Sequence, residues 1–275
     1  MTEIPIFDSL THPMPNKNWI SKSYDGKNSL DILKKSMKEE NIKWAFAVGM
    51  GNKIGGYEEN NYADFITKNT KNIFPVAFID LKKIKSFDNT RLSKYFDKLI
   101  KKGYYGIKLH PRIGKFSYLD KEIPKIINIA AKKNLVILLC TYIWSEYGKK
   151  YYIGPDLMIE LLKKIKKAKV ILVHGGTVQL MQYIEICRCF LNTLLDLSFT
   201  LCKYRGSSMD LDIKFAFNQF DRRICIGSDA PEFSSKELRE SFNLFSKLLS
   251  KDKLKNIAFK NIFNFVPMLK NISNE

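Results

Sequence analysis

Short runs of consecutive apolar residues alternate along the chain with longer segments in which apolar residues recur at helical spacing. The apolar runs are IPIFDSL, KWAFAVGM, IFPVAFID, YGIKLH, LVILLC, KVILVH, TLLDLSF and RICIGSD. Because these runs are continuously apolar, they are typical of strands that are buried on both faces of a sheet. The helical segments lie around residues 30–40, 62–70, 92–102, 123–133, 157–167, 178–190, 209–220 and 236–249.

This regular alternation of strands and helices favours parallel crossover units. Eight such units in a chain of 275 residues predict a (β/α)8 TIM barrel, formed as a single domain over residues 1–275. A doubly wound open sheet is the alternative, but the sequence lacks the Gly-rich dinucleotide fingerprint that such a sheet often carries. The longer connections follow strand ends, which predicts that one rim of the barrel is the functional face.

Composition restricts the classes of partner. The net charge of +18 comes from lysines spread over helix-like segments, so we expect a pull on anionic small molecules and no nucleic-acid partner. The apolar runs are shorter than the roughly 18 residues that span a bilayer, and the five cysteines show no CxxC spacing. We therefore expect a cytoplasmic protein with reduced thiols and no membrane partner. The sequence leaves open whether the chain forms a homo-oligomer.

The chain has only three histidines, and each stands at the end of an apolar run. His12, His110 and His174 are each followed by Pro or Gly, and a fourth run ends at Asp229. Because the carboxyl ends of parallel strands meet at the mouth of a barrel, the pattern predicts one shared site. Alternation along each strand predicts inward-facing sets: Asp8, Leu10 and His12; Lys108 and His110; Val136, Leu138 and Cys140; Leu172 and His174; Cys225, Gly227 and Asp229.

Two kinds of chemistry fit such a cluster. Imidazole and carboxylate groups can hold a divalent metal that activates water, or Asp229 can act as a general base while His174 polarises a carbonyl. Both predict hydrolysis. Lys108 is expected to point inward and to pair with Asp8, with another acid or with substrate, since an unpaired buried ammonium is costly.

Further candidates lie in the long loops of the rim. Aromatic side chains that could form a wall for a ring or a sugar are Trp19, Tyr142, Trp144 and Tyr147. Lys203 and Arg205 follow the seventh strand and could bind an anionic group. Packing under the loops explains the aromatic residues equally well.

Five segments, taken together, resemble a known family: IFDSLTH, GIKLHP, KVILVHGG, RICIGSDAP and IAFKNIFNF. In this order they are similar to the amidohydrolase-related TIM-barrel family, which includes decarboxylases and lactonases of aromatic-acid breakdown. The resemblance implies hydrolysis or C–C cleavage at a divalent metal, held by first-strand histidines, a fifth-strand histidine and the eighth-strand aspartate. This chain departs from that pattern because Leu10 and Cys140 stand where two of the histidines are expected.

The departures leave two mechanistic branches. In the first, a zinc ion lies between His12, Cys140 and Asp229 and activates water against a carbonyl that His174 and His110 orient. The cysteine would have to bind as its thiolate, whose pKa a neighbouring cation lowers. A buried free cysteine is also commonly a small apolar filler.

In the second branch no metal binds. Asp229 is then the base, His174 and His12 hold the oxyanion, and Lys108 and Arg112 bind a substrate carboxylate or phosphate. Both branches describe a hydrolase that acts on an anionic small-molecule ester, lactone or amide. A decarboxylase of the same family and a catalytically inactive barrel that binds a small molecule are the alternatives.

Overall fold

The computed structural model describes residues 3–24, 26–51, 59–143 and 154–270. Within these residues eight parallel strands pair in sequence order to form one sheet, which confirms the predicted (β/α)8 TIM barrel. The strands are β1 (Ile6–Thr11), β2 (Ile42–Val48), β3 (Ile73–Phe78), β4 (Gly106–Leu109), β5 (Val136–Cys140), β6 (Val170–Val173), β7 (Thr193–Asp196) and β8 (Ile224–Cys225).

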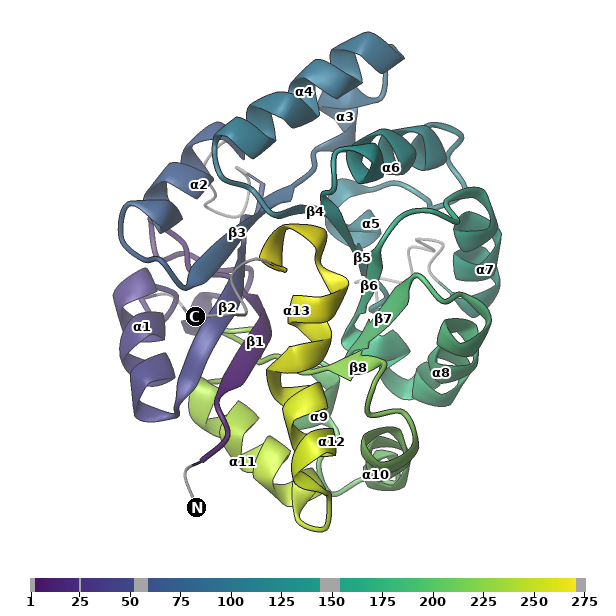
Figure 1. The fold of residues 1–275 in the computed structure, drawn as a ribbon. Helices are drawn as coiled ribbons and strands as arrows, with labels where there is room; N and C mark the ends of the chain where they lie inside the picture. The colour runs from purple at the N-terminus through teal and green to yellow at the C-terminus, as the bar shows by residue number, and fades with distance from the viewer. Residues whose placement is uncertain (1–2, 25, 52–58, 144–153, 271–275) are drawn as a thin grey trace.

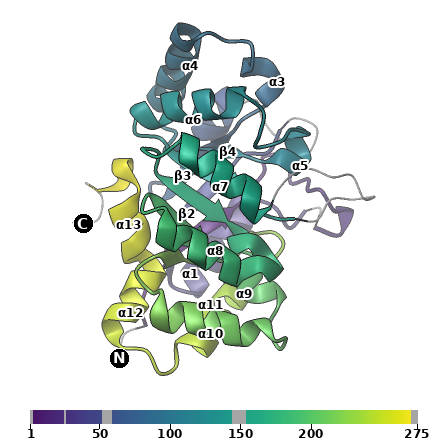
Figure 2. The ribbon, with the colours of Figure 1, turned by 90° about the vertical axis from the view of Figure 1, so that its right-hand side faces the viewer.

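Helices surround this ring of strands, as Figures 1 and 2 show. They are α1 (Leu30–Glu39), α2 (Glu59–Thr67), α3 (Leu81–Ile84), α4 (Asn89–Lys101), α5 (Pro111–Gly114), α6 (Glu122–Lys132), α7 (Pro155–Lys164), α8 (Leu180–Cys189), α9 (Thr200–Lys203), α10 (Met209–Gln219), α11 (Ser235–Ser246), α12 (Lys251–Lys255) and α13 (Asn261–Phe265). Polar caps set several helix starts. The Ser234 hydroxyl accepts a hydrogen bond from the backbone N–H of Glu237, whose carboxylate in turn accepts from Ser234.

Backbone hydrogen bonds close the barrel between its first and last strands. Ser9 N donates to the carbonyl oxygen of Ile226 at 3.0 Å, and Asp229 N donates to that of Leu10 at 2.9 Å. These bonds continue beyond the short strand β8. They hold the loop after β8, including Asp229, directly against the end of β1.

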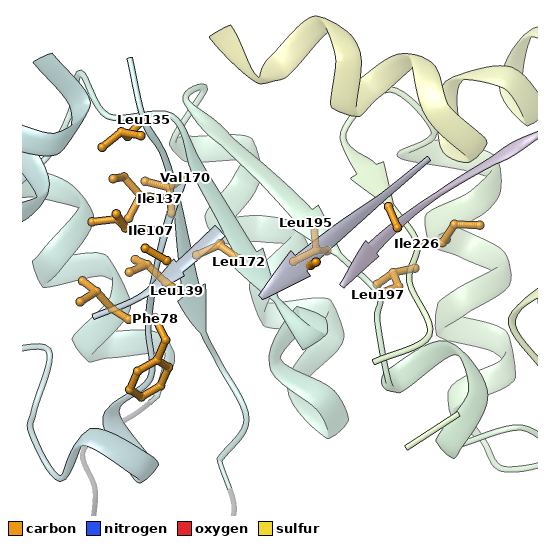
Figure 3. Close-up of a cluster of buried hydrophobic side chains, with 14 of the residues drawn as sticks. Phe78, Ile107, Leu135, Ile137, Leu139, Val170, Leu172, Leu195, Leu197 and Ile226 are labelled. Carbon is orange, nitrogen blue, oxygen red and sulfur yellow. The ribbon is translucent and has the colours of Figure 1, made fainter. Parts of the chain in front are cut away.

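Two apolar layers stabilise the barrel. The inner layer fills its interior with side chains such as Phe46, Leu138 and Cys225, and the outer layer lies between the strands and the helices. Figure 3 shows part of the outer layer, with Ile137 and Leu139 of β5 beside neighbours from β4 and β6. The sheet is thus buried on both faces, as the continuous apolar runs predicted.

Helix α13 closes the amino-terminal end of the barrel. Its Phe263 packs edge-to-face against Phe7 at 5.5 Å between ring centroids, and against Trp44 at 5.0 Å. Figure 1 shows α13 across the centre of the ring. Since this end is filled, access to the strand ends is left at the opposite rim. Among the described helices, none has both the length and the apolar composition that crossing a membrane requires.

The inward-facing predictions hold for most strands but fail for Asp8 and Leu172. Asp8 lies between Phe7, which belongs to the inner layer, and Ser9, which donates to Asp196, and the register of β1 is irregular after Asp8. Leu10, Val136 and Leu138 lie in the inner layer as predicted. Leu172 does not, because it belongs to the outer layer (Figure 3), while its neighbour Val173 faces inward. The chain changes direction directly after β6, where His174 has a φ of 70°. Alternation therefore stops at Val173 and cannot place the side chain of His174.

Candidate active site at the barrel mouth

Strand ends bring together the side chains that the sequence singled out. The buried members of this group are His12, Lys108, His110, Cys140, His174 and Asp229. Three of them form a contact group that we call the Lys108 corner, which consists of His12, Lys108 and Asp229. The Nε2 atom of His12 lies 3.3 Å from Oδ1 of Asp229 and 3.4 Å from Nζ of Lys108.

The ring of His12 is held from its other side. Its Nδ1 atom lies 2.8 Å from the carbonyl oxygen of Val48 at the end of β2, so Nδ1 carries a proton and donates it. The ring of Trp19 lies 5.1 Å from that of His12, and Trp19 Nε1 donates to Glu232 at 2.7 Å. The loop after β1 therefore lies next to the Lys108 corner.

Burial and the neighbouring charges set the protonation states in this corner. Burial lowers the pKa of Lys108, and Asp229 opposes that change. Burial and the nearby Lys108 lower the pKa of His12, which favours a neutral ring. Burial opposes ionisation of Asp229, but His174 and His12 in their protonated forms, together with Lys108, outweigh it and lower the pKa of this carboxyl. Asp229 is thus available as a carboxylate at neutral pH.

His110 and Cys140 contact each other at the ends of β4 and β5. The backbone N–H of Ile113 donates to His110 Nδ1 at 3.3 Å, so the proton of a neutral ring lies on Nε2. That Nε2 atom is 3.6 Å from Cys140 Sγ. Burial raises the pKa of the Cys140 thiol, although Lys108 opposes the change. Lys108 and Arg112 favour the thiolate, but burial outweighs them and favours the protonated thiol.

The zinc site expected of His12, Cys140 and Asp229 does not fit this geometry. Among the described residues, no three His, Cys, Asp or Glu side chains come together in a way that could hold a metal ion. Cys140 contacts His110 instead, and the Lys108 ammonium lies against the ring nitrogen of His12 that a metal would need. The Lys108 ammonium therefore lies where a metal ion bound to His12 Nε2 would have to lie.

A second polar group, which we call the Asp196 network, consists of Ser9, His174, Asp196 and Ser198. The hydroxyls of Ser9 and Ser198 each donate a short hydrogen bond to the carboxyl of Asp196. The backbone N–H of His174 donates to the same carboxyl at 3.4 Å, and that of Ser198 at 3.0 Å. Asp196 thus ties β1, β6 and β7 together. Burial raises its pKa, against the effect of the Ser198 hydrogen bonds.

His174 is oriented by this network. Its Nδ1 atom lies 3.2 Å from the carbonyl oxygen of Ser198, so Nδ1 carries the proton of the neutral ring. Burial lowers the pKa of His174 to about 4, against the opposing charge of Asp229. The ring is therefore neutral at physiological pH.

The loop from His174 to Thr177 is strained and tightly held. All four of its residues have positive φ, and Gly176 N donates to the hydroxyl of Thr141 at 2.7 Å. A Cβ atom at Gly176 would lie 2.0 Å from the ring of Tyr183. The two glycines of the KVILVHGG motif therefore allow a backbone turn that places His174 at the mouth.

Arg112 is a further cation at the rim. Its guanidinium lies over the ring of Tyr142, 4.6 Å from its centroid, and its buried Nε atom has no hydrogen-bond partner among the described residues. Tyr142 also packs edge-to-face against His174 at 6.0 Å. Trp144 and Tyr147, which were candidates for an aromatic wall, lie outside the described residues.

Two expectations from the sequence need correction, and one polar network was missed. Lys108 does not pair with Asp8, because Asp8 accepts hydrogen bonds from Ser228 N at 2.9 Å and Ser228 Oγ at 2.6 Å. Burial raises the pKa of Asp8 to about 7. Arg205 forms an ion pair with Glu240 at 3.5 Å, so this cation already has a partner in α11. The third point is the network around the carboxyl of β7, which was not predicted from the sequence.

The positions of Asp196 and Ser198 at the barrel mouth could have been predicted from the sequence. They lie two residues apart at the end of the run TLLDLSF, the same spacing that identified Lys108 and His110. This strand end has no histidine, so it lacks the residue type that marked the others.

The fold and the mouth define the class as a (β/α)8-barrel protein with a buried polar site at the carboxyl ends of its strands. Neither the family models nor the curated proteins contain a match to the sequence. Solved structures do match.

An uncharacterised TIM-barrel protein from Bordetella bronchiseptica has a TM-score of 0.78 at 16% identity, over 97% of this chain and 100% of that one. A zinc-bound amidohydrolase from Burkholderia multivorans has a TM-score of 0.68 at 13% identity, over 96% and 99%. The 5-carboxyvanillate decarboxylase of Sphingomonas paucimobilis has a TM-score of 0.68 at 8% identity, over 96% and 99%. At these identities the likeness establishes the fold.

Proposed function

We propose that this protein is a hydrolase of the amidohydrolase-related family that acts on an anionic small-molecule ester, lactone or amide without a metal ion. The Lys108 corner carries the proposal. A carboxylate of lowered pKa and an ammonium both lie within 3.4 Å of one ring nitrogen of the neutral His12 imidazole at the barrel mouth. Such a group combines a base for water with a cation for developing negative charge.

Two cations support an anionic substrate. Lys108 is 1% exposed, and in the part of the chain that the structure describes the buried Nε atom of Arg112 has no hydrogen-bond partner. An oxygen of a substrate carboxylate or phosphate would satisfy Arg112, which presents several donors in one plane. The overall charge of +18 would draw such a substrate towards the protein.

The proposed reaction begins when Asp229 takes a proton from water while the water oxygen bonds to the carbonyl carbon. The electron pair of the carbonyl double bond moves onto its oxygen. When the tetrahedral intermediate collapses, the bond to the leaving alcohol or amine breaks, and Asp229 returns the proton to that group. One water is consumed. An ester or amide gives one acid and one alcohol or amine, and a lactone gives a single hydroxy acid.

A panel of anionic esters, lactones and amides tests the proposal with protein treated with a chelator and checked for metals by elemental analysis. We expect turnover by metal-free wild type and a loss of at least about 1,000-fold in kcat for Asp229→Asn, because a general base contributes factors of this order. The matched control is Asp31→Asn, an exposed acid in α1 that should leave kcat unchanged.

Other outcomes point to the alternatives. Release of carbon dioxide from a carboxylated substrate would identify a decarboxylase, as in one structural neighbour. Saturable binding of panel members without any turnover would identify a non-catalytic binding barrel. Turnover that requires added zinc and is lost in Cys140→Ser would replace the metal-free mechanism with the zinc branch.

A further inference from the structure

The hydrogen-bond partners of the histidines determine which ring nitrogen can donate. His12 and His174 each direct Nδ1 at a backbone carbonyl oxygen, that of Val48 at 2.8 Å and that of Ser198 at 3.2 Å. A carbonyl oxygen can only accept, so Nδ1 must carry the proton in both rings. A neutral ring has one N–H, so Nε2 of both neutral rings is an acceptor, and that of His12 faces Lys108 at 3.4 Å. Asp229 Oδ1, at 3.3 Å from the same His12 nitrogen, pairs with it only when the ring is doubly protonated.

His110 has the opposite tautomer and is also committed. Its Nδ1 accepts from the backbone N–H of Ile113, and its Nε2–H is directed at Cys140 Sγ. Burial holds the pKa of His110 well below its ordinary value, and Lys108 lowers it further. As a result, none of the three imidazoles has a free N–H for a substrate oxygen. The expectation that His12 and His174 hold an oxyanion conflicts with these tautomers.

Lys108 has the donors that the histidines lack. An ammonium carries three N–H groups, and one of them suits His12 Nε2 at 3.4 Å. Within the described part of the chain, no acceptor is in hydrogen-bond contact with the other two. Leaving donors of a buried cation unsatisfied is costly, so their retention points to a ligand oxygen. Lys108 lies in β4, and its position is fixed by strand pairing with Phe78 and Leu138.

We propose, on the basis of the hydrolysis proposed above, that Lys108 Nζ donates the hydrogen bond to the carbonyl oxygen that becomes negative when water attacks. His12 and His174 are then acceptors, His12 for Lys108 and His174 for an O–H of the attacking water. Lys108 is thus the fixed cation of the site and takes the part that a metal ion would otherwise play. The proton itself is transferred by Asp229, so the atoms and charges balance as described above.

The tautomers can be measured without a substrate. In protein labelled with ¹⁵N at histidine, long-range ¹H–¹⁵N spectra show which nitrogen of each ring is protonated, and His12→Gln, His110→Gln and His174→Gln assign the three rings. We expect Nδ1–H for His12 and His174 and Nε2–H for His110 at pH 7. Lys108→Met should shift the Nε2 resonance of His12, and the control Lys133→Met, a surface lysine paired with Asp97, should not.

An Nε2–H tautomer or a doubly protonated ring at His12 or His174 would overturn the proposal, because a histidine could then hold the oxyanion. With a substrate from the panel, Lys108→Met should lower kcat about 100-fold with less change in KM, and Lys108→Arg should recover part of the loss. An unchanged kcat in Lys108→Met would also overturn it. If the panel shows no turnover, the proposed function fails, while the tautomer spectra still report on the donors.

Discussion

The two halves of the barrel mouth use polar groups in opposite ways. In the Asp196 network one buried carboxyl accepts from two hydroxyls and two backbone N–H groups, so its members are bonded to one another. In the Lys108 corner Asp229 and Lys108 converge on one nitrogen of His12, and part of the hydrogen-bonding capacity of Lys108 has no partner among the described residues. We infer that the Asp196 network fixes the positions of the strand ends, whereas the Lys108 corner is suited to binding a ligand.

This difference separates structural from chemical roles among residues of the same type. Asp196 and Asp229 are both buried carboxyls at neighbouring strand ends, yet burial raises the pKa of the first, whereas His174, His12 and Lys108 outweigh burial and lower that of the second. Satisfied networks stabilise a fold, and functional sites keep unsatisfied groups at some cost in stability. Substitutions in the two halves should therefore have opposite effects on stability.

The largest effect is expected from Asp196→Ala. The change leaves the Ser9 and Ser198 hydroxyls and the His174 N–H without their acceptor, so the free energy of unfolding should fall by about 4 kcal/mol. Urea unfolding at pH 7 measures it, with the exposed Asp31→Ala as control. A loss below about 1 kcal/mol would show that the network does not hold the mouth together.

A pH effect on stability should come from His174. Its pKa is about 4 in the folded protein against an ordinary value of 6.5, so the unfolded chain binds the proton first as the pH falls. Stability is complete above pH 6.5 and is lost as the pH falls towards 4, by up to about 3 kcal/mol. His174→Gln should reduce this dependence in urea unfolding at pH 7 and pH 5. An identical pH dependence in the variant would mean that burial, Asp229 and Lys108 together leave the pKa of the ring unshifted.

Gly176→Ala should be more costly than Gly206→Ala. Both glycines have positive φ, of 74° and 81°, but a Cβ at Gly176 would meet the Tyr183 ring, whereas one at Gly206 would meet nothing within 4 Å. Both variants should lose stability through backbone strain at positive φ. The clash should add about 2 kcal/mol to the loss in free energy of unfolding for Gly176→Ala. Thermal unfolding of the two variants gives the difference. Equal losses would show that the loop yields easily and that His174 is not rigidly placed.

The smallest effect is expected from Lys108→Met, and it should have the opposite sign. Replacing a buried ammonium that keeps unsatisfied donors with an apolar side chain of similar length should raise the free energy of unfolding by about 1 kcal/mol. The same urea titration measures it. A loss of several kcal/mol would instead identify Lys108 as part of a structural ion pair.

Much of the fold was predictable because it depends on local patterns. Continuous apolar runs and helical spacing identified all eight strands of the described barrel. The strand ends predicted that His12 and Asp229 converge at the mouth, where they lie 3.3 Å apart, but not that Lys108 contacts His12. Alternation failed at Leu172 because the backbone turns at His174, and a positive φ at a histidine has no signature in the apolar pattern. Local periodicity ends where the loop begins.

The sequence predicted which residues lie at the barrel mouth, but not which of them contact each other. The sequence grouped His12, Cys140 and Asp229 as metal ligands, yet the contacts pair Cys140 with His110 and bring Lys108 to His12. Which two strand ends face each other at atomic distance depends on barrel shape and side-chain rotamers. These are properties of the packed structure.

The sequence by itself determined the barrel and the strand ends that form its mouth, because burial on both faces and helical periodicity are written in the order of apolar residues. Only the tertiary structure decided the tautomers, the protonation states and the separation of the Lys108 corner from the Asp196 network. Those properties depend on contacts between strands far apart in the chain, such as Ser9 with Asp196 and His12 with Lys108. The direction of a hydrogen bond depends on both partners, and the residue pattern along one strand carries no information about a partner on another strand.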